Sequence, residues 1–479
     1  MVSTVAIHPV QHVEFDGGLI RRLSQSGPRY TSYPTADRFS DQFGYKDYLQ
    51  AVSHAQARGA RHPLSLYVHI PFCDTVCYYC GCNKIVTKNR EKAATYLGYL
   101  KREIAMQGKL FAGANHVEQL HFGGGTPTYL SDAQMDDLMQ VIRRWFLLAD
   151  DEKGEYSIEV DPRSVTAERI HSLRRQGFNR ISPGVQDFDD EVQKAVNRIQ
   201  PEAATLGVIQ AARDAGFRSV SIDLIYGLPK QTVMSMNQTL DKVIAANPDR
   251  IAVYHYAHLP HLFKPQRRIN EDELPSSDAK LDMLALCIRK LNDAGYIYIG
   301  MDHFAKPDDE LAIAQRQGRL HRNFQGYSTH AEADLVAVGV SAISSVGMCY
   351  SQNAKTLDEY YDRLDSGELP VVRGYTLSLD DVLRRFIIQM LMCNFELSLR
   401  SLEQAYPITF KAYFTRELEE LKELAELGLV TLDDDWITVT LKGRLLIRNV
   451  CMVFDRHLHE ARQLQSQTGV PLQRYSRTV

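Results

Sequence analysis

Short apolar segments alternate with helical ones along much of the chain, and this alternation constrains the fold more than any other feature. Residues 64–70, 117–122 and 219–226 are clear strand candidates, and each precedes a helix-forming stretch. About six such β-then-α units occur between residues 64 and 299. This pattern predicts a parallel sheet with right-handed crossovers, either a partial barrel or an open doubly wound sheet. Both folds place the active site at the carboxyl ends of the strands.

The two ends of the chain lack this alternation. The segment GPRYTSYPTADRF is rich in prolines and aromatic residues, and the first sixty residues predict an irregular arm that packs on the main domain. From about residue 357, a helix–hairpin–helix pattern over 415–454 resembles a winged-helix unit. Because it lacks a basic recognition helix, we expect it to serve packing rather than DNA binding. The predicted domains are an N-terminal arm at 1–57, an α/β domain at 58–350 and a mainly α-helical domain at 351–479.

The composition is that of an ordinary globular protein. The 479 residues are 44% apolar and 24% charged, which disfavours a disordered chain. The formal net charge of −4 gives no overall attraction to nucleic acid or to an acidic membrane surface. No apolar run approaches the ~20 residues of a membrane span, and the N-terminal segment lacks the apolar core of a secretory signal. We therefore expect a cytoplasmic protein with no nucleic-acid partner and no membrane span.

Four of the eight cysteines lie within ten residues, at the spacing C-x3-C-x2-C-x-C. Disulfide frameworks are typical of small secreted domains, so in this large chain the group indicates metal or redox chemistry. A zinc site would need a second CxxC pair or suitably spaced histidines, and neither occurs nearby. Three thiolates suit three corners of a [4Fe–4S] cluster with one open iron, and the alternative is a closed electron-transfer cluster with a fourth cysteine ligand. The four are Cys73, Cys77, Cys80 and Cys82.

The longer segment YVHIPFC…CYYCGCNK is more specific than the cysteine spacing. The spacing resembles the radical S-adenosylmethionine (SAM) superfamily, and the segment resembles the oxygen-independent coproporphyrinogen III oxidase family, also called coproporphyrinogen dehydrogenase. The resemblance implies an α/β fold: a partial (β/α)6 TIM-like radical SAM barrel, with an N-terminal arm at the substrate site and a mainly helical C-terminal domain that contains the winged-helix-like unit. It extends through GPRYTSYPTA, HFGGGTPTYL, IEVDP, GVQDF, VNR, IDLIYGLPKQT, YAHLP, GMDHFAKPDDELA, HRNFQGY, GVSAIS and KGRLLIRN.

The resemblance implies two cofactors. Cys73, Cys77 and Cys80 would ligate one [4Fe–4S] cluster per chain, and SAM would bind the fourth iron and yield a 5′-deoxyadenosyl radical on one-electron reduction. Family contacts to this SAM match Tyr67, Gly124 in GGGTP, Glu159 and Ile343. A second SAM would lie beside the first, and its contacts match Tyr79, Gly125, Thr126, Gln186, Arg198, Asp223 and Ala257.

Several of these positions have a simpler interpretation without the family. Alone, the glycine run predicts only a turn, and Glu159 is compatible with a solvated strand end. Two positions also depart from the family pattern, because Tyr79 stands where Phe is common and Pro183 stands where Met is expected.

The resemblance implies catalytic roles for Cys82 and Arg29. Cys82 is linked to activity in the oxidase family, whereas related haem chaperones have Phe near this position; the alternative for Cys82 is packing beside the cluster. Arg29 matches a family arginine proposed to meet the substrate, and arginine suits bidentate capture of a carboxylate.

The implied reaction is the oxygen-independent oxidative decarboxylation of two propionate side chains of coproporphyrinogen III to vinyl groups. The product is protoporphyrinogen IX, in haem biosynthesis. The reaction needs a reductant and an electron acceptor that the sequence does not identify, and we expect a monomer. The alternative function is that of a radical SAM haem chaperone without decarboxylase activity.

Overall fold

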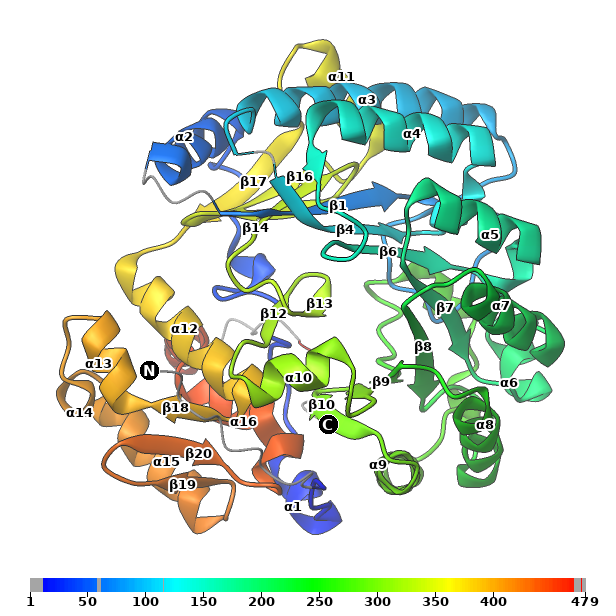
Figure 1. Ribbon diagram of the computed structural model, residues 1–479. Helices are drawn as coiled ribbons and strands as arrows, with labels where there is room; N and C mark the ends of the chain where they lie inside the picture. The colour runs from blue at the N-terminus through cyan, green and yellow to red at the C-terminus, as the bar shows by residue number, and fades with distance from the viewer. Residues whose placement is uncertain (1–11, 58–61, 115, 469–474, 476–479) are drawn as a thin grey trace. The chain divides into compact units, whose positions relative to one another are not determined.

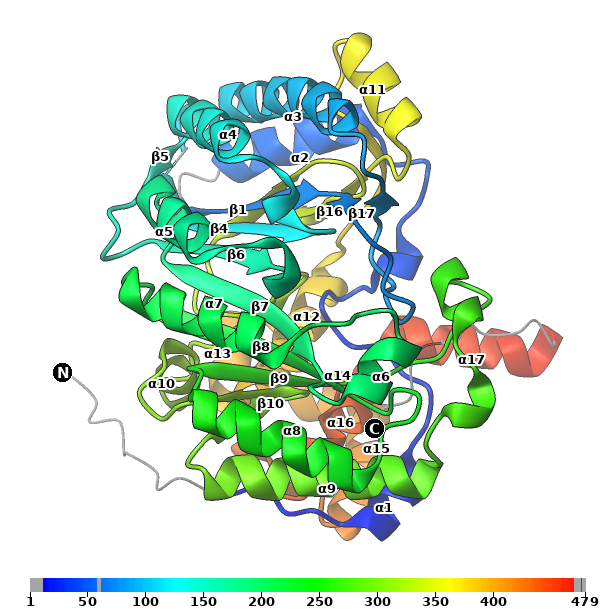
Figure 2. The same cartoon turned by 90° about the vertical axis from the view of Figure 1, so that its right-hand side faces the viewer.

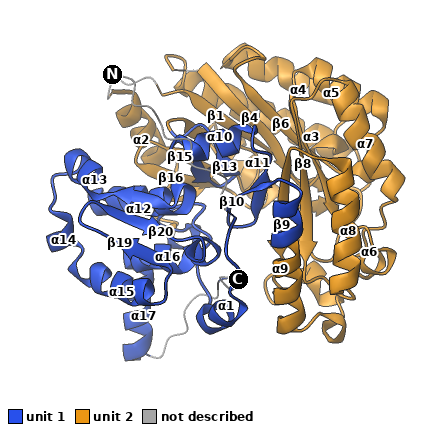
Figure 3. Cartoon of the chain, turned by 60° about the horizontal axis from the view of Figure 1, so that its bottom comes forward, with its two compact units in different colours: residues 1–38, 288–331, 377–479 blue, residues 39–287, 332–376 orange. Residues whose placement is uncertain are grey.

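The computed structural model describes residues 12–57, 62–114, 116–468 and 475, which form two compact units (Figure 3). The larger, here called the α/β unit, comprises the described residues of 39–287 and 332–376. The smaller, here called the helical unit, comprises the described residues of 1–38, 288–331 and 377–479. The three-domain division of the sequence analysis stays a prediction.

A mainly parallel sheet forms the centre of the α/β unit (Figure 1). Six strands run parallel in the order β1-β4-β6-β7-β8-β9, which confirms the predicted parallel sheet. Six of the seven residues of β1 are buried, as expected for a parallel strand covered on both faces. The bounds are β1 (Leu64–Ile70), β4 (His116–Gly124), β6 (Glu155–Val160), β7 (Arg180–Gln186), β8 (Ser219–Tyr226) and β9 (Arg250–His255), with β5 (Leu147–Leu148) beside β4 and the short pair β2 (Phe72–Cys73) and β3 (Ile85–Val86) in the cysteine loop.

Helices α3, α4, α5 and α7 pack side by side along one face of this sheet (Figures 1 and 2). In α4, Ser131 and Gln134 form a capping box that begins the helix. Met135, Leu138 and Ile142 recur at helical spacing and are buried, so α4 presents an apolar stripe inward. The helices of this unit are α2 (Tyr45–Ala57), α3 (Glu91–Leu110), α4 (Asp132–Trp145), α5 (Ala167–Gln176), α6 (Asp190–Ala195), α7 (Glu202–Asp214), α8 (Val233–Ala246) and α11 (Leu357–Asp365), and the residues of α9 (Ser277–Asp293) are divided between the two units.

The strand register brings several polar residues to the carboxyl edge of the sheet. Glu159 of β6 is paired with Ser182 of β7, and Gly184 of β7 is paired with Asp223 of β8. β4 ends at Gly124, which is paired with the last residue of β1. The segments that follow these strands therefore meet at one edge, as the alternation predicts.

Four further strands extend the sheet beyond β1, and the sequence analysis missed them. β14 is parallel to β1, and β15, β16 and β17 continue antiparallel. All five residues of β16 are buried although three are Ser, Gln and Asn, so a search for apolar runs does not find it. The bounds are β14 (Asp334–Val338), β15 (Ile343–Val346), β16 (Cys349–Asn353) and β17 (Val371–Thr376).

The N-terminal region is more regular than the irregular arm that we expected. It contains α1 (Gly17–Leu23), capped by Asp16, and the thirteen-residue α2. In α2 only Tyr48 and Val52 are buried, one turn apart. This apolar stripe is too narrow to give a clear helical period in the sequence, which explains the error.

The helical unit contains the hairpin predicted over residues 429–440, which forms as β19 and β20 with β18 on the other side of β20. The predicted helix over 442–454 forms as the 3-10 helix η6 (Gly443–Leu446) followed by α16. The likeness to a winged-helix unit stays a prediction. The bounds are β10 (Ile297–Gly300), β11 (His303–Ala305), α10 (Glu310–Arg316), β12 (His321–Asn323), β13 (Gly326–Ser328), α12 (Leu379–Asn394), β18 (Glu396–Ser398), α13 (Leu399–Ala405), α14 (Phe410–Tyr413), α15 (Thr415–Glu426), β19 (Val430–Leu432), β20 (Trp436–Val439), α16 (Ile447–Val453) and α17 (Arg456–Thr468).

Across the described ranges, none of the helices combines the length and the apolarity that a bilayer crossing requires.

Candidate functional site

A cavity of about 760 Å³ lies at the carboxyl ends of β4, β6, β7 and β8 in the α/β unit. This volume is in the range of ~300 to ~1,000 Å³ that is common for small-molecule and cofactor sites. Its walls are the cysteine loop after β1, the turn after β4 and the ends of the next three strands. Most of the predicted site residues line it: Cys73, Cys77, Cys80, Cys82, Tyr79, Gly124, Gly125, Thr126, Glu159, Gln186, Arg198 and Asp223.

The cysteine loop is fixed near its start and in its middle. Near its start, β2 pairs with β3, and the amide of Thr126 donates to the carbonyl of Phe72 at 2.8 Å. In its middle, the side-chain amide of Asn197 donates to the carbonyl of Val76 at 2.7 Å. These contacts tie the loop to the turn after β4 and to the segment after α6, so the thiols are held against the cavity.

Cys73 and Cys77 have hydrogen-bond donors beside them that come from outside the cysteine loop. The Thr126 hydroxyl lies 3.6 Å from Cys73 Sγ. Arg198 Nη1 lies 3.5 Å and Arg163 Nη2 lies 3.6 Å from Cys77 Sγ. Thiolate sulfur is the usual protein ligand of iron–sulfur clusters, and donors beside ligating sulfurs offset their negative charge. The donor set therefore fits a [4Fe–4S] cluster.

Cys82 lies beside Cys80. A hydrogen bond from the Cys82 thiol lowers the pKa of Cys80, and the same contact raises the pKa of Cys82. Among the described residues, no three His, Cys, Asp or Glu side chains converge as ligands of a single metal ion. The contact between the two thiols leaves open the alternative that Cys82 is a fourth cluster ligand.

The turn after β4 has room only for glycine at two positions. Gly124 has φ +116°, and a Cβ atom there would lie 2.6 Å from the ring of His69. A Cβ atom on Gly125 would lie 2.7 Å from the main chain of Pro71. The turn therefore packs directly on the end of β1, and its main chain forms part of the cavity wall.

Glu159 is held at the edge of the cavity by two neighbours. Its Oε2 accepts the amide of Gly124 at 3.2 Å, and its Oε1 lies 3.4 Å from His121 Nε2. His121 also contacts the Ser157 hydroxyl at 2.5 Å and stacks on the ring of Tyr67, with centroids 5.8 Å apart. Glu159 is thus an oriented acceptor at the strand end, although its side chain is 44% exposed.

Asp223 is the second carboxyl group of the cavity. Burial and the neighbouring Glu159 carboxylate raise the pKa of Asp223 to about 7. A hydrogen bond from Ser182 and the charge of Arg198 lower it, but by less. A carboxyl group with this pKa is present both as an acceptor and as a donor near neutral pH. It suits a ligand that offers hydroxyl groups or a positive charge.

Comparisons with known proteins agree with this geometry. The family model of the radical SAM superfamily matches residues 67–243, and that of the HemN C-terminal domain matches residues 377–446. The oxygen-independent coproporphyrinogen III oxidase of Escherichia coli is 52% identical over 96% of this chain and 99% of its own length, and that of Pseudomonas aeruginosa is 52% identical over 93% and 96%. This chain belongs to the oxygen-independent coproporphyrinogen III oxidase family.

A solved structure supports the same family. The coproporphyrinogen III oxidase HemN of E. coli, described as a radical SAM enzyme, matches with a TM-score of 0.89 and 51% identity, over 93% of this chain and 100% of that one. The α/β radical SAM fold with a mainly parallel sheet and a helical C-terminal region is thereby confirmed. Membership of the radical SAM superfamily implies a [4Fe–4S] cluster and SAM.

Three of the predicted SAM contacts lie outside the cavity lining. Tyr67 supports Glu159 through His121, as described above. Ala257 is joined to Tyr79 by Gln266, whose Nε2 donates to the carbonyl of Tyr79 at 2.9 Å and to that of Ala257 at 3.3 Å. Ile343 is the first residue of β15 and is half-buried.

Arg29, the predicted substrate residue, belongs to the helical unit. Its guanidinium forms an ion pair with Asp302 of the same unit. Its role in the oxidase reaction stays a prediction.

The sequence analysis missed three residues that shape the cavity region. Gln266 is buried and joins two main-chain segments, and no local pattern marks it. Asp161 and Arg163 lie in the cavity wall directly after β6. Their place in the segment Asp-Pro-Arg at a strand end was the available signal, since the first turn after a parallel strand is where such sites form.

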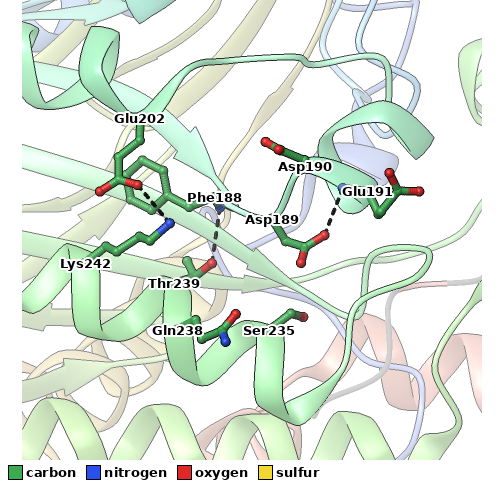
Figure 4. A pocket seen from close by; sticks show the side chains of 9 residues that line it. All are labelled: Phe188, Asp189, Asp190, Glu191, Glu202, Ser235, Gln238, Thr239 and Lys242. Atoms are coloured by element: carbon green, nitrogen blue, oxygen red, sulfur yellow. Dashed lines mark hydrogen bonds and ion pairs between the residues drawn. The ribbon is translucent and has the colours of Figure 1, made fainter.

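A second cavity of about 350 Å³ contains none of the predicted site residues (Figure 4). Lys242 pairs with Glu202 at 2.8 Å, and the Thr239 hydroxyl accepts the amide of Phe188 at 3.2 Å. Its polar groups satisfy one another, and we assign no ligand to it. The lining residues are Phe188, Asp189, Asp190, Glu191, Glu202, Ser235, Gln238, Thr239 and Lys242.

Proposed function

We propose that this protein carries out the oxygen-independent oxidative decarboxylation of two propionate side chains of coproporphyrinogen III to vinyl groups, which gives protoporphyrinogen IX in haem biosynthesis. Relatives that match nearly the whole chain are named oxygen-independent coproporphyrinogen III oxidases. The observation that carries the proposal is the single cavity that gathers the clustered thiols, a glycine turn and two carboxyl groups. Cys82 favours the oxidase over the haem-chaperone alternative.

Three cysteines hold the metal centre in this proposal. Cys73, Cys77 and Cys80 ligate one [4Fe–4S] cluster, and Thr126, Arg163 and Arg198 donate to the ligating sulfurs. When bound, the cluster and SAM supply one-electron reduction and hydrogen-atom abstraction. Loss of a hydrogen atom, CO2 and one further electron then converts a propionate into a vinyl group, with an unidentified reductant and an unidentified electron acceptor.

The remaining cavity residues bind and orient SAM. Gly124 presents main-chain groups and Glu159 accepts hydrogen bonds from the first SAM, which Tyr67 and Ile343 also contact through main-chain or apolar groups. A second SAM contacts the ring of Tyr79 and the polar groups of the adjoining wall. The further residues of that second site are Gly125, Thr126, Gln186, Arg198, Asp223 and Ala257.

The N-terminal arm, residues 1–57, contributes to the substrate site, and its Arg29 binds a propionate. Cys82 also contacts the substrate. Residues 58–350 form the radical SAM domain and residues 351–479 the C-terminal domain. We expect a monomeric enzyme. We also expect it in the cytoplasm, because an open cluster and eight unpaired thiols suit a reducing compartment.

One anaerobic assay tests the function. Reconstituted protein, SAM, a reductant and coproporphyrinogen III should give a product that has lost two CO2 by mass spectrometry. Cys77→Ser should lose the iron and the activity, whereas Cys349→Ala, a buried cysteine outside the cavity, should keep both. Haem binding by the wild type without vinyl formation would support the chaperone alternative instead.

The role of Arg29 has its own test. Loss of one charge-assisted carboxylate contact in Arg29→Ala should cost about 1.5–3 kcal/mol in substrate turnover. The cleavage of SAM in the absence of substrate should stay near the wild-type rate. An equal loss of both activities would indicate that the arm serves folding.

A further inference from the structure

The guanidinium of Arg163 has no role in the proposed binding of SAM, yet it occupies a distinctive place in the cavity wall. Asp161 begins the 3-10 turn η3 (Pro162–Ser164), and its Oδ1 accepts the amide of Arg163 at 3.0 Å. The Arg163 side chain folds back onto the same carboxylate, with Nε 2.9 Å from Oδ1 and Nη2 2.6 Å from Oδ2. The carboxylate thus fixes the guanidinium in one orientation.

The fixed guanidinium reaches a cysteine of the proposed cluster. Arg163 Nη2 lies 3.6 Å from Cys77 Sγ, and Arg198 Nη1 lies 3.5 Å from the same sulfur. Arg198 also lies 3.5 Å from Asp161 Oδ2, so the carboxylate stands between the two arginines. Burial by itself would raise the pKa of Asp161. The hydrogen bond and charge of Arg163 and the charge of Arg198 lower this pKa overall, so the carboxyl group stays ionised. The group carries two positive charges and one negative charge beside one thiol.

The other two thiols lack an arginine–carboxylate group. Cys73 has the neutral hydroxyl of Thr126, and Cys80 has the thiol of Cys82 and the Lys84 ammonium, which also binds the Cys80 carbonyl oxygen at 2.9 Å. Of the three thiols, Cys77 alone has a guanidinium beside it that a carboxylate holds in place. Hydrogen bonds and positive charge at a ligating sulfur stabilise the more negative, reduced state of an iron–sulfur cluster.

We propose that Arg163, oriented by Asp161, is a positioning residue that holds the Cys77 sulfur and raises the reduction potential of the cluster. This inference rests on the proposed function, since it requires the cluster at Cys73, Cys77 and Cys80. Asp161 has two effects in this arrangement: it orients Arg163, and it partly cancels the positive charge.

The test is a redox titration of the anaerobically reconstituted protein, followed by EPR in the absence of SAM. Arg163→Gln should keep its iron and shift the equilibrium toward the oxidised cluster about tenfold, which for one electron is a fall of about 59 mV in midpoint potential. Asp161→Asn removes a negative charge and should shift the potential upward. Opposite signs in the two variants separate a charge effect from simple disruption.

Two controls complete the test. Arg174→Gln removes a comparable arginine–aspartate pair, Nη2 to Asp151 Oδ2 at 2.8 Å, which lies outside the cavity lining, and should leave the potential unchanged. Thermal unfolding of the proteins before reconstitution measures structural damage independently. Arg163→Lys keeps the charge but not the planar fork, so its potential should fall less than that of Arg163→Gln.

The outcomes are distinct. An Arg163→Gln protein with full iron and the wild-type potential would overturn the inference, as would downward shifts in both Arg163→Gln and Asp161→Asn. If Arg163→Gln loses its iron, the midpoint potentials of the other two variants decide the matter. A potential below that of the wild type in Arg163→Lys and above it in Asp161→Asn would support the inference, and any other order would overturn it. A wild-type protein that binds no cluster would instead contradict the proposed function.

Discussion

Two groups of buried charges in this protein differ in how they are compensated. In the helical unit, Arg384 Nε donates to both oxygens of Asp380 at 3.0 and 2.9 Å, and Nη1 donates to Glu417 at 2.8 Å and to the carbonyl of Phe454 at 3.1 Å. In the cavity of the α/β unit, burial and the charge of the Glu159 carboxylate raise the pKa of Asp223 to about 7.

The difference indicates what each group does. Arg384 joins α12 to α15 and to the residue after α16, and its Nε and Nη1 donors have close acceptors, so its charge serves the fold. Asp223 faces a cavity with its charge poorly compensated, which is costly unless a ligand supplies the missing partner. In this protein, the well-paired buried charge stabilises the fold, and the poorly paired one indicates a binding site.

Breaking the paired group should have the largest effect on stability. Arg384→Leu removes the buried partner of Asp380 and Glu417, which keep only the more exposed Arg456 and Arg416, and it should lower the free energy of unfolding by about 3 kcal/mol. Urea unfolding of the protein without cofactors measures this. The exposed pair Lys411–Asp434, at 2.8 Å, is the matched control, and Lys411→Ala should leave the free energy of unfolding nearly unchanged. Similar small losses in both variants would remove the contrast between the two groups.

A steric change at the cavity should have an intermediate effect. A Cβ atom on Gly125 meets the main chain of Pro71, so Gly125→Ala should lower stability by about 1–3 kcal/mol and weaken SAM binding. Gly113→Ala adds a methyl group where no atom lies within 4 Å, and it should leave both unchanged. Thermal unfolding and calorimetric SAM binding measure the two effects. Unimpaired SAM binding by Gly125→Ala would show that the turn is not part of the site.

The pH dependence of stability at Asp223 tests the other side of the comparison. The folded protein binds this proton more tightly than the unfolded chain, because the pKa is about 7 in the fold and 3.8 ordinarily. Relative to Asp223→Asn, the wild type should therefore lose stability as the pH rises from about 4 to about 7, with no further change above. Parallel urea-unfolding series at several pH values measure the difference. A wild-type advantage that grows with pH would mean that the carboxylate is paired like those of the helical unit.

The strand–helix alternation predicted the parallel sheet, and the cysteine spacing with the family resemblance predicted most of the cavity residues. The strand–helix alternation sets the order of the elements, and Glu159 and Asp223 belong to strands whose carboxyl ends meet at one edge. The cysteine loop and the glycine turn are each contiguous in sequence, so their place follows from the strand that precedes them.

The missed features depend on partners that are distant in sequence. β16 is buried although it carries Ser, Gln and Asn, and α2 has too few buried residues to show a period. Gln266 contacts Tyr79 from 187 positions away, and Arg163 contacts Cys77 from 86 positions away. No local pattern encodes such contacts, since they arise only when the sheet brings the segments together.

The most direct test of the cavity assignment is the EPR spectrum of the reduced, reconstituted protein with and without SAM. If three cysteines hold a [4Fe–4S] cluster and one iron is open, SAM should perturb the spectrum of the wild type. Cys82→Ser should keep its iron and the same response to SAM while losing vinyl formation. A spectrum that SAM leaves unchanged, or zinc as the sole metal, would contradict the assignment.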